Sequence, residues 1–413
     1  MSSWGNRMTR RIHSWALVAA LVALAACAGM PQQGSGFSKE RLDALTARMQ
    51  ADVQKGQIPG AVMLVARNGS IAYFEALGTR DPKTGAPMQK DSVFRIYSMS
   101  KPIVTAAAMI LVEEGRLQLS DPVSTYLPEL KEMKVGVEKG NALEFVTPAR
   151  SMTIQDLMRH TSGLTYGFFG KSLVKAEYER AKVDVGVDRK EYLKVVSRLP
   201  LQYQPGTTWD YSISIDVLAF VIERVSGKRI EDYLQERIFA PLGMKDTAFS
   251  IDEARHARIA QAFDSDPGVK IENWANVRDA SRRPSGGGGL LSTAEDYLRF
   301  CQMFLNGGEL GGVRILSRKT VEYMDSDHLG TIRGPLYLPG PGYTFGLGGA
   351  VRLSDGMSAT PGSAGEFNWG GYGGTYFWID PKEKVIGIFM MQAPTPRGYY
   401  RALYRSMVYS AMQ

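Results

Sequence analysis

The sequence predicts an α+β protein in which an antiparallel sheet is flanked by helices, with an all-α domain inserted into the chain. Three observations lead to this prediction. An apolar hairpin lies at 60–81, strand-like segments lie between 366 and 393, and the region between them is mostly helical. The two sets of strands are most simply joined into one sheet, and the helical region is then the inserted domain.

The first 26 residues are expected to be a signal peptide. A basic, acid-free segment precedes the apolar run ALVAALVALAA, which is too short to span a bilayer comfortably. The run ends in LAAC, a pattern similar to that of bacterial lipoproteins, which makes Cys27 the expected lipidated first residue. Simple cleavage around Cys27 is the alternative. We therefore expect an exported protein of the bacterial envelope or periplasm, lipid-anchored at Cys27 or else soluble.

The remaining elements follow in chain order. Residues 27–37 are a polar tether, and Ser38 is the expected cap of an amphipathic helix. Asn68-Gly69 is typical of a tight hairpin turn. A buried helix is expected up to about 115, further helices at 151–164 and 214–228, another after the glycine run at 286–289, and a last one from 397. The predicted domains are an α/β domain of 38–120 and 286–413 and a mostly helical domain of 121–285.

Composition excludes several classes of function. The 413 residues carry a net charge of +7, and removal of residues 1–26 takes away three arginines and no acid, leaving +4. This modest charge forms no basic cluster, so no nucleic-acid partner is expected. The histidines are scattered, and apart from Cys27 at the signal the only cysteine is Cys301, so no metal, cofactor or disulfide is expected. No Gly-x-Ser-x-Gly motif occurs either.

Ser98 and Lys101 lie three residues apart at the head of PIVTAAAMIL, a segment typical of a buried helix. Residues i and i+3 share a helix face, so Lys101 can reach the Ser98 hydroxyl. Desolvation can lower a lysine pKa enough for the neutral amine to take the serine proton. Alternatively, Ser98 only caps the helix. The same spacing recurs at Ser172 and Lys175, in a charged, loop-like stretch where we expect a solvated lysine.

Two further segments can carry chemistry. Tyr211 precedes an apolar helix, where a phenol can bind a lysine and act as a general base, or simply pack. Trp369-Gly370-Gly371 opens a strand, and its glycines mark either a bulge or the close approach of a backbone or ligand. A strand-edge amide there could supply half of an oxyanion hole. The glycine run at 286–289 lacks the ending of a phosphate-binding loop.

Taken in order, Ser98-x-x-Lys101, Tyr211 and the Trp-Gly-Gly motif resemble the serine β-lactamase and penicillin-binding-protein superfamily, in its class C-like branch. LMRHTSGL, FAPLGMKDTAFS and GGGGLLSTAEDYLRF resemble the same branch, so the likeness covers nearly the whole chain after Phe37. The resemblance implies a β-lactamase/transpeptidase-like fold. It implies that Ser98 is the acylated nucleophile, Lys101 its partner and Tyr211 the general base. The backbone amides of Ser98 and Tyr372 would form the oxyanion hole.

Two positions depart from the β-lactamase pattern. Ile213 replaces the asparagine of Tyr-x-Asn, and Trp369 replaces the lysine of Lys-Thr-Gly. Those groups hold the amide and carboxylate of a β-lactam, so the implied substrate-binding set of Trp369, Gly370, Gly371 and Ile213 offers an apolar surface that favours neutral esters. Tyr-Ser-x with Trp-x-Gly is similar to family VIII carboxylesterases.

The implied function is hydrolysis of small-molecule carboxylic esters, with short-to-medium acyl chains, through an acyl-enzyme on Ser98. A β-lactamase, a D-aminopeptidase or DD-peptidase, or an acyltransferase using the same site is the alternative. A catalytically silent envelope-binding module is disfavoured, because binding alone would not require the serine, the lysine and the tyrosine together.

Overall fold

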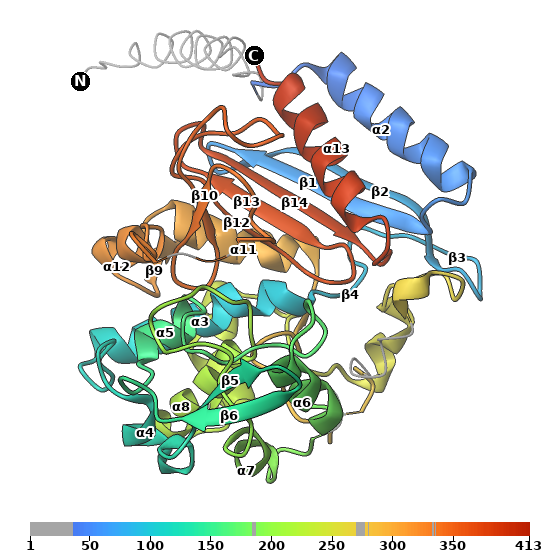
Figure 1. Ribbon diagram of the computed structural model, residues 1–413. Helices are drawn as coiled ribbons and strands as arrows, with labels where there is room; N and C mark the ends of the chain where they lie inside the picture. The colour runs from blue at the N-terminus through green and yellow to red at the C-terminus, as the bar shows by residue number, and fades with distance from the viewer. Residues whose placement is uncertain (1–35, 184–186, 270–276, 280, 333, 335) are drawn as a thin grey trace, which may run out of the picture.

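The computed structural model describes residues 36–183, 187–269, 277–279, 281–332, 334 and 336–413. They form an eight-stranded sheet with helices on both faces (Figure 1). The strand order is β10-β11-β12-β13-β14-β1-β2-β3, and neighbouring strands are antiparallel. The predicted α+β fold with an antiparallel sheet is therefore confirmed. The expected signal peptide and Cys27 lie outside the described residues.

The sheet joins the two ends of the chain. β1 pairs with β14, with Ala61 opposite Met391, so the N-terminal hairpin extends the C-terminal strands. Asn68 and Gly69 form the predicted two-residue turn and have positive φ angles of 52° and 79°. The strands are β1 (Gly60–Arg67), β2 (Ser70–Asp81), β3 (Ala86–Pro87), β10 (Tyr343–Phe345), β11 (Ala350–Arg352), β12 (Phe367–Gly370), β13 (Tyr376–Asp380) and β14 (Val385–Met391).

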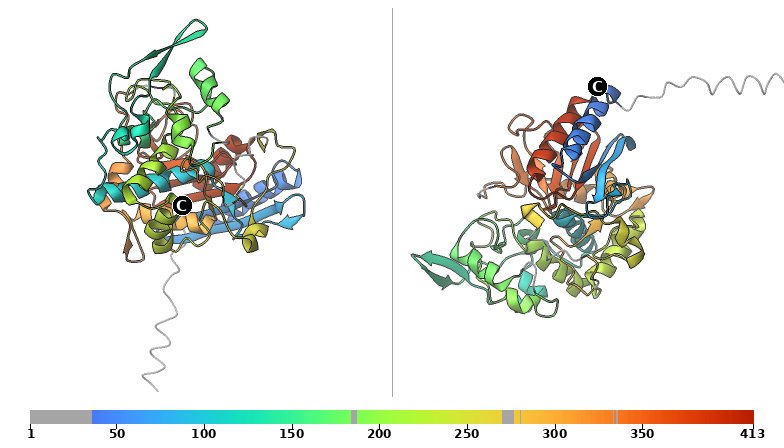
Figure 2. Two further views of the ribbon diagram at one scale, coloured as in Figure 1. Left: turned by 90° about the horizontal axis from the view of Figure 1, so that it is seen from below. Right: turned by 90° about the vertical axis from the view of Figure 1, so that its right-hand side faces the viewer.

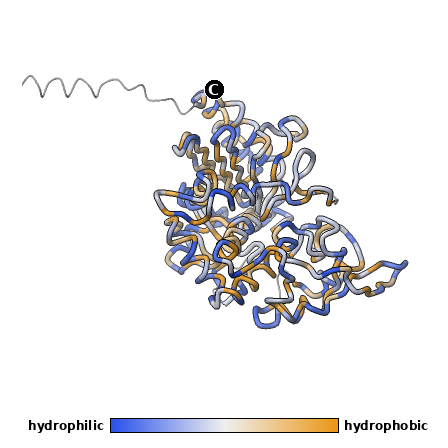
Figure 3. Tube along the Cα trace, turned by 90° about the vertical axis from the view of Figure 1, so that its left-hand side faces the viewer, coloured by the Kyte–Doolittle hydropathy of each residue, from blue (hydrophilic) through white to orange (hydrophobic). Residues whose placement is uncertain are grey.

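Two terminal helices, α2 (Lys39–Gln54) and α13 (Arg397–Ser410), cover one face of the sheet (Figure 1). Leu45 of α2 and Tyr404 of α13 belong to the apolar cluster that packs against this face. The Ser38 hydroxyl accepts a hydrogen bond from the backbone N–H of Arg41, as expected of a helix cap. In Figure 3, which colours the trace by hydropathy, the strands inside the molecule are mostly the orange of hydrophobic residues. The buried apolar side chains on this face fix the position of α13, and other residues of the same helix line the candidate site.

The opposite face is covered by α3 (Ser100–Glu113) and α11 (Ala294–Leu305). Every residue of α3 from Ser100 to Leu111 is buried, which confirms the prediction of a buried helix behind Ser98. α3 also contacts α8 (Ser214–Ser226), so it lies between the sheet and the mostly helical middle of the chain, residues 121–285. A helix enclosed on all sides is a rigid support for residues at its N-terminal end.

The middle segment contains, besides helices, a hairpin that the sequence analysis did not predict. Its strands β5 (Val135–Lys139) and β6 (Ala142–Val146) project from the rest of the molecule (Figure 2). Most of the hairpin residues are exposed, so the apolar periodicity that would have indicated strands is weak. The helix expected at 151–164 is also shorter, because α5 spans only Ile154–Met158. The predicted domain boundaries stay predictions.

The other short elements complete the chain between the N-terminal hairpin and the C-terminal strands. They are α4 (Val123–Tyr126), η2 (Pro128–Leu130), α6 (Leu173–Ala181), α7 (Tyr192–Val196), α9 (Ile230–Leu234), η3 (Gln235–Phe239), α10 (Ala240–Leu242), η4 (Glu253–Arg258), β8 (Glu309–Leu310), β9 (Val313–Arg314) and α12 (Arg318–Met324).

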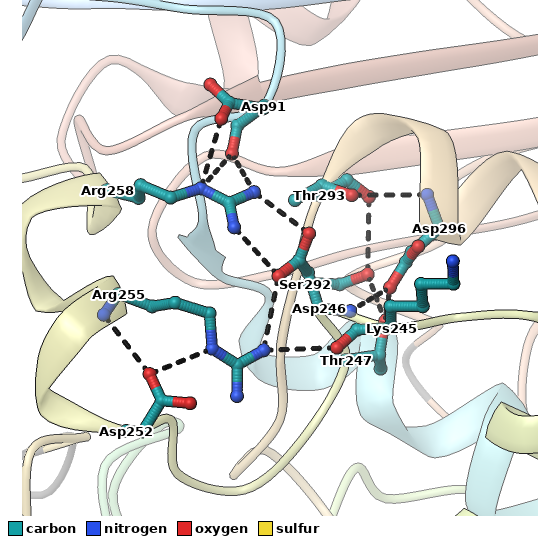
Figure 4. A network of polar contacts seen from close by, with 10 residues as sticks. All are labelled: Asp91, Lys245, Asp246, Thr247, Asp252, Arg255, Arg258, Ser292, Thr293 and Asp296. Carbon is teal, nitrogen blue, oxygen red and sulfur yellow. Dashed lines mark hydrogen bonds and ion pairs between the residues drawn. The ribbon is translucent and has the colours of Figure 1, made fainter.

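The strand that leads into Ser98 is held by a polar network (Figure 4). β4 (Phe94–Arg95) pairs with β7 (Leu291–Ser292). Just before β4, the carbonyl of Asp91 accepts hydrogen bonds from Arg258, whose guanidinium also donates to both carboxylate oxygens of Asp246 at 2.8 and 2.9 Å. Arg255 donates to the same carboxylate. The network therefore ties the approach to Ser98 to the segment 245–258.

Candidate active site

Ser98 lies in the short 3₁₀ turn η1 (Tyr97–Met99), immediately before α3. Its side chain is half-buried, whereas Lys101 on the first turn of α3 is completely buried. The Lys101 Nζ atom lies 3.2 Å from the Ser98 Oγ atom. The i, i+3 spacing thus brings the two groups together, as the sequence predicts.

The residue before Ser98 holds an unusual backbone conformation. Tyr97 has a φ of 45°, a region that bulky residues rarely occupy. Its ring is fully buried and contacts the ring of Tyr372 edge-on, at a centroid distance of 5.8 Å. Such a conformation costs about 1–3 kcal/mol and persists where the surroundings fix it. The turn therefore presents Ser98 in one orientation, beside the loop that follows β12.

Lys101 has two further polar partners that the sequence analysis missed. Its Nζ atom lies 3.2 Å from the Tyr166 hydroxyl and 2.5 Å from the Gly287 carbonyl oxygen. It also lies 4.5 Å from the centre of the Tyr211 ring. These contacts fix the amine between the serine and the tyrosine, and they come from segments 65 and 186 residues away along the chain.

In the glycine run at 286–289, the lack of a side chain at Gly287 is required by close packing. A Cβ atom on Gly287 would lie 2.3 Å from the Asp216 Oδ2 atom and 3.1 Å from the Tyr166 hydroxyl oxygen. Only a residue without a side chain fits there, and this allows the carbonyl of Gly287 to reach Lys101. The run, which the sequence offered as a possible phosphate-binding loop and as part of a family-like segment, was the available signal for this contact.

Tyr211 lies just before α8, and its ring is buried beside Lys101. Burial raises the pKa of Tyr211, while hydrogen bonds from Ser98 and Trp369 act in the opposite direction. The Trp369 indole Nε1 donates to the Tyr211 hydroxyl at 3.0 Å. Trp369 is therefore a hydrogen-bond donor to Tyr211, in addition to the apolar surface expected from the sequence.

A polar cluster supports Tyr211 from behind. The ring of the fully enclosed His160 lies 4.6 Å from the Tyr211 ring, and its Nδ1 atom is 3.0 Å from the Ser212 hydroxyl. Burial lowers the pKa of His160 well below its usual value, and Lys101 lowers it further whenever its amine is protonated. A neutral imidazole thus adds no competing charge beside the lysine.

A cavity of about 320 Å³ opens onto Ser98. Aromatic side chains form much of its wall, including Tyr166, Tyr211 and Trp369, and Gly370, Gly371 and Tyr372 also line it. Ile213 does not line this cavity: it is 1% exposed, part of the hydrophobic core at the start of α8. Its apolar side chain packs in the core there, and its place in the substrate-binding set stays a prediction.

The second serine–lysine pair differs from its expected environment. Ser172 caps α6, and its hydroxyl accepts a hydrogen bond from the backbone N–H of Lys175. Lys175 is buried instead of solvated, and its Nζ atom lies 3.4 Å from an Asp210 carboxylate oxygen. The expectation of a solvated lysine was wrong because its partner is 35 residues away in sequence.

The described part of the chain contains no group of three or more His, Cys, Asp or Glu side chains suited to hold a metal ion. Within the same part of the chain, no helix combines the length and apolar character needed to cross a membrane.

Comparison with known proteins matches the family model described as Beta-lactamase to residues 45–409. Protein Rv1367c of Mycobacterium tuberculosis is 36% identical over 365 residues, covering 85% of this chain and 90% of the relative. Esterase EstB of Burkholderia gladioli is 32% identical over 376 residues, covering 85% and 88%. Lovastatin esterase of Penicillium rubens is 32% identical over 378 residues, covering 84% and 92%.

Among solved structures, EstCE1, described as a hydrolase with promiscuous acyltransferase activity, superposes with a TM-score of 0.76. The two are 27% identical, and the match covers 90% of this chain and 99% of EstCE1. The family model spans most of the chain, and the esterases named above match it over more than four-fifths of its length. By its sequence and its fold, this chain belongs to the Beta-lactamase family.

Proposed function

We propose that Ser98 is the nucleophile of this serine ester hydrolase, with Lys101 and Tyr211 as its proton-transfer partners. The observation that carries the proposal is their convergence at one cavity. The Lys101 Nζ atom is 3.2 Å from the Ser98 Oγ atom and lies against the Tyr211 ring, while the cavity opens onto Ser98 and Tyr211. A hydroxyl in contact with a buried amine is the arrangement that nucleophilic catalysis requires.

The protonation state of the tyrosine supports a division of roles. Because burial raises the pKa of Tyr211, its phenol keeps its proton at neutral pH. Neutral Lys101 then takes the Ser98 proton as Oγ bonds to the ester carbonyl carbon. Tyr211 gives its own proton to the departing alkoxide as the C–O bond breaks, and Lys101 returns a proton to Tyr211. A water molecule hydrolyses the acyl-enzyme by the reverse sequence.

The negative charge on the carbonyl oxygen needs donors during both steps. The backbone amides of Ser98 and Tyr372 are the proposed donors, since both residues line the cavity and the Tyr97–Tyr372 ring contact joins their segments. A single donor of this kind commonly lowers the barrier by about 3–4 kcal/mol. The aromatic wall of the cavity supports esters of short-to-medium acyl chains as substrates.

Transfer of the acyl group to an alcohol instead of water is the second candidate activity. It is favoured by relatives described as acyltransferases, such as mokF of Monascus pilosus at 29% identity over 366 residues. The same acyl-enzyme serves both reactions, so the outcome depends on which nucleophile enters the cavity. An added alcohol that yields a new ester from 4-nitrophenyl butyrate would demonstrate it.

Export and lipid anchoring at Cys27 are proposed from residues 1–27 alone. The basic segment, the short apolar run and LAAC support them. Metabolic labelling with a fatty acid should mark the wild-type protein and leave Cys27→Ala unlabelled. Labelling of both proteins, or of neither, would contradict lipidation at this residue.

The test of the nucleophile uses two serines with the same spacing to a lysine. Ser98→Ala should lose at least a thousandfold in kcat toward 4-nitrophenyl butyrate. Ser172→Ala removes a helix cap and a hydrogen bond to the Gln202 side chain, so it should cost about 1–2 kcal/mol of stability and keep its activity per folded molecule. Substantial turnover by Ser98→Ala would overturn the assignment. Faster cleavage of nitrocefin or a D-Ala-D-Ala peptide than of short esters would favour the lactamase or peptidase alternative.

A further inference from the structure

One wall of the active-site cavity is cationic. Arg397 and Arg401 lie four residues apart on α13 and therefore share a face of that helix. Both line the cavity that contains Ser98. The C-terminal helix, which is remote in sequence from the nucleophile, thus brings two guanidinium groups to the space that a substrate would occupy.

Arg401 is fixed against the strand that carries Trp369. A Cβ atom on Gly370 would lie 2.6 Å from the Arg401 Cζ atom and 2.7 Å from its Nη1 atom, so the absence of a side chain admits the guanidinium. The Nη2 atom donates to the carbonyls of Gly371 and Thr375. Both of these hydrogen bonds come from the Nη2 atom of the guanidinium. Its Nε atom is buried without a hydrogen-bond partner among the described residues.

Arg397 completes the cationic wall. Its Nη1 atom donates to the Pro394 carbonyl oxygen, and its guanidinium lies 4.8 Å from the centre of the Tyr372 ring. Within the part of the chain that the structure describes, no carboxylate forms an ion pair with Arg397 or Arg401. The next arginine on the same face, Arg405, differs because Glu366 neutralises it.

The remaining acid at the cavity does not compensate these cations. Asp216 also lines the cavity, but its Oδ1 atom accepts hydrogen bonds from Arg283 and Ser285. Burial and the charge of Arg397 lower the pKa of Arg401 to about 10, so Arg401 is still charged at neutral pH. Both guanidinium groups are half-buried on adjacent turns of one helix, so their charges repel each other, and an anion bound between them or beside them would relieve that repulsion.

We infer that Arg397 and Arg401 form a carboxylate-binding subsite, so that the preferred substrates are esters that also carry a carboxylate. The inference rests on the proposed esterase function and narrows its substrate class. It also revises the expectation of neutral esters drawn from Trp369. The cation absent from the strand at Trp369 is supplied from α13, through the space left by Gly370.

The carboxylate could belong to either part of the ester, and two matched pairs of substrates distinguish them. Hydrogen 4-nitrophenyl adipate and its methyl ester differ in a charge on the acyl side. The anion 4-butyryloxybenzoate and the neutral 4-butyryloxybenzamide differ in a charge on the alcohol side. We expect a preference of about tenfold or more in kcat/KM, mainly through KM, for the anion in one of the pairs.

Arg397→Gln should bring that preference close to one, and Arg318→Gln, at an exposed site on α12, should leave it unchanged. Equal kcat/KM values for both members of both pairs, while Ser98-dependent hydrolysis of 4-nitrophenyl butyrate persists, would overturn the subsite and leave the esterase function intact. Absence of hydrolysis of every ester would overturn the esterase function instead.

A binding measurement tests the subsite without turnover. Ser98→Ala protein can be titrated calorimetrically with 4-butyryloxybenzoate, 4-butyryloxybenzamide, adipate and adipamide. The inference predicts affinity about tenfold or more higher for at least one anion than for its amide, lost when Arg397→Gln is added. Equal affinity for anion and amide in both pairs would contradict it, whatever the kinetics show.

Discussion

Replacement of Trp369 by phenylalanine tests how the indole acts on the candidate acid–base tyrosine. The change keeps an aromatic ring in the cavity wall and removes the Nε1 donor that lies 3.0 Å from the Tyr211 hydroxyl. A buried hydrogen bond contributes about 1 kcal/mol between neutral groups and about 1.5–3 kcal/mol when one group is charged. A factor of ten in rate corresponds to about 1.4 kcal/mol.

The expected loss in kcat for Trp369→Phe is therefore about fivefold if Tyr211 stays neutral throughout, and on the order of a hundredfold if it carries charge in the transition state. KM should change little, because the apolar wall is retained. The assay is steady-state hydrolysis of 4-nitrophenyl butyrate, with the fraction of folded protein checked by circular dichroism.

Trp209 supplies a matched control. Its ring also stacks on Tyr211, at a centroid distance of 6.2 Å, but its Nε1 atom has no hydrogen-bond partner among the described residues. Trp209→Phe should lower stability by creating a small void, and should change kcat by less than about threefold. An unchanged kcat in Trp369→Phe, or an equal loss in Trp209→Phe, would refute the role of the indole N–H.

Three further predictions concern the supports of the site. Gly287→Ala should lower kcat at least tenfold, because the new methyl group displaces the carbonyl that binds the active-site lysine; an unchanged kcat would contradict this contact. Glu366→Gln should cost about 3–5 kcal/mol of unfolding free energy, because it leaves Arg405 buried without its counter-charge; a loss below about 1 kcal/mol in denaturant unfolding would refute it. Burial raises the pKa of Asp246, but hydrogen bonds from Arg258 and Arg255 outweigh it and lower the pKa below its usual value. That stabilisation is present above the unfolded-state pKa of about 3.9 and is lost as pH falls through the folded-state value. Asp246→Asn should therefore lower the melting temperature at pH 7 and converge with wild type in acid, and an equal difference at all pH values would contradict the assignment.

Local patterns predicted the parts of the fold that depend on neighbouring residues. The Asn68-Gly69 turn, the Ser38 cap and the buried α3 helix each follow from a few consecutive side chains. The proximity of Ser98 and Lys101 follows from helix geometry in the same way. These features need no knowledge of the rest of the chain.

The contacts that complete the site could not be read from local patterns. Tyr166 and Gly287 reach Lys101 only because the tertiary fold brings distant segments together. The burial of Lys175 depends on a distant partner as well. The place of Arg401 at the cavity could not be predicted for the same reason, because it follows from the packing of α13 on the sheet and from the space over Gly370.

The most direct test of the proposed mechanism is identification of the acylated residue. The protein is quenched in acid during turnover of a slowly hydrolysed 4-nitrophenyl ester, or after reaction with a fluorophosphonate, and its peptides are analysed by mass spectrometry. The mechanism predicts one added acyl or phosphonyl group on the peptide that contains Ser98, still present in Ser172→Ala and absent in Ser98→Ala. Modification of another residue, or the same modification in Ser98→Ala, would contradict it.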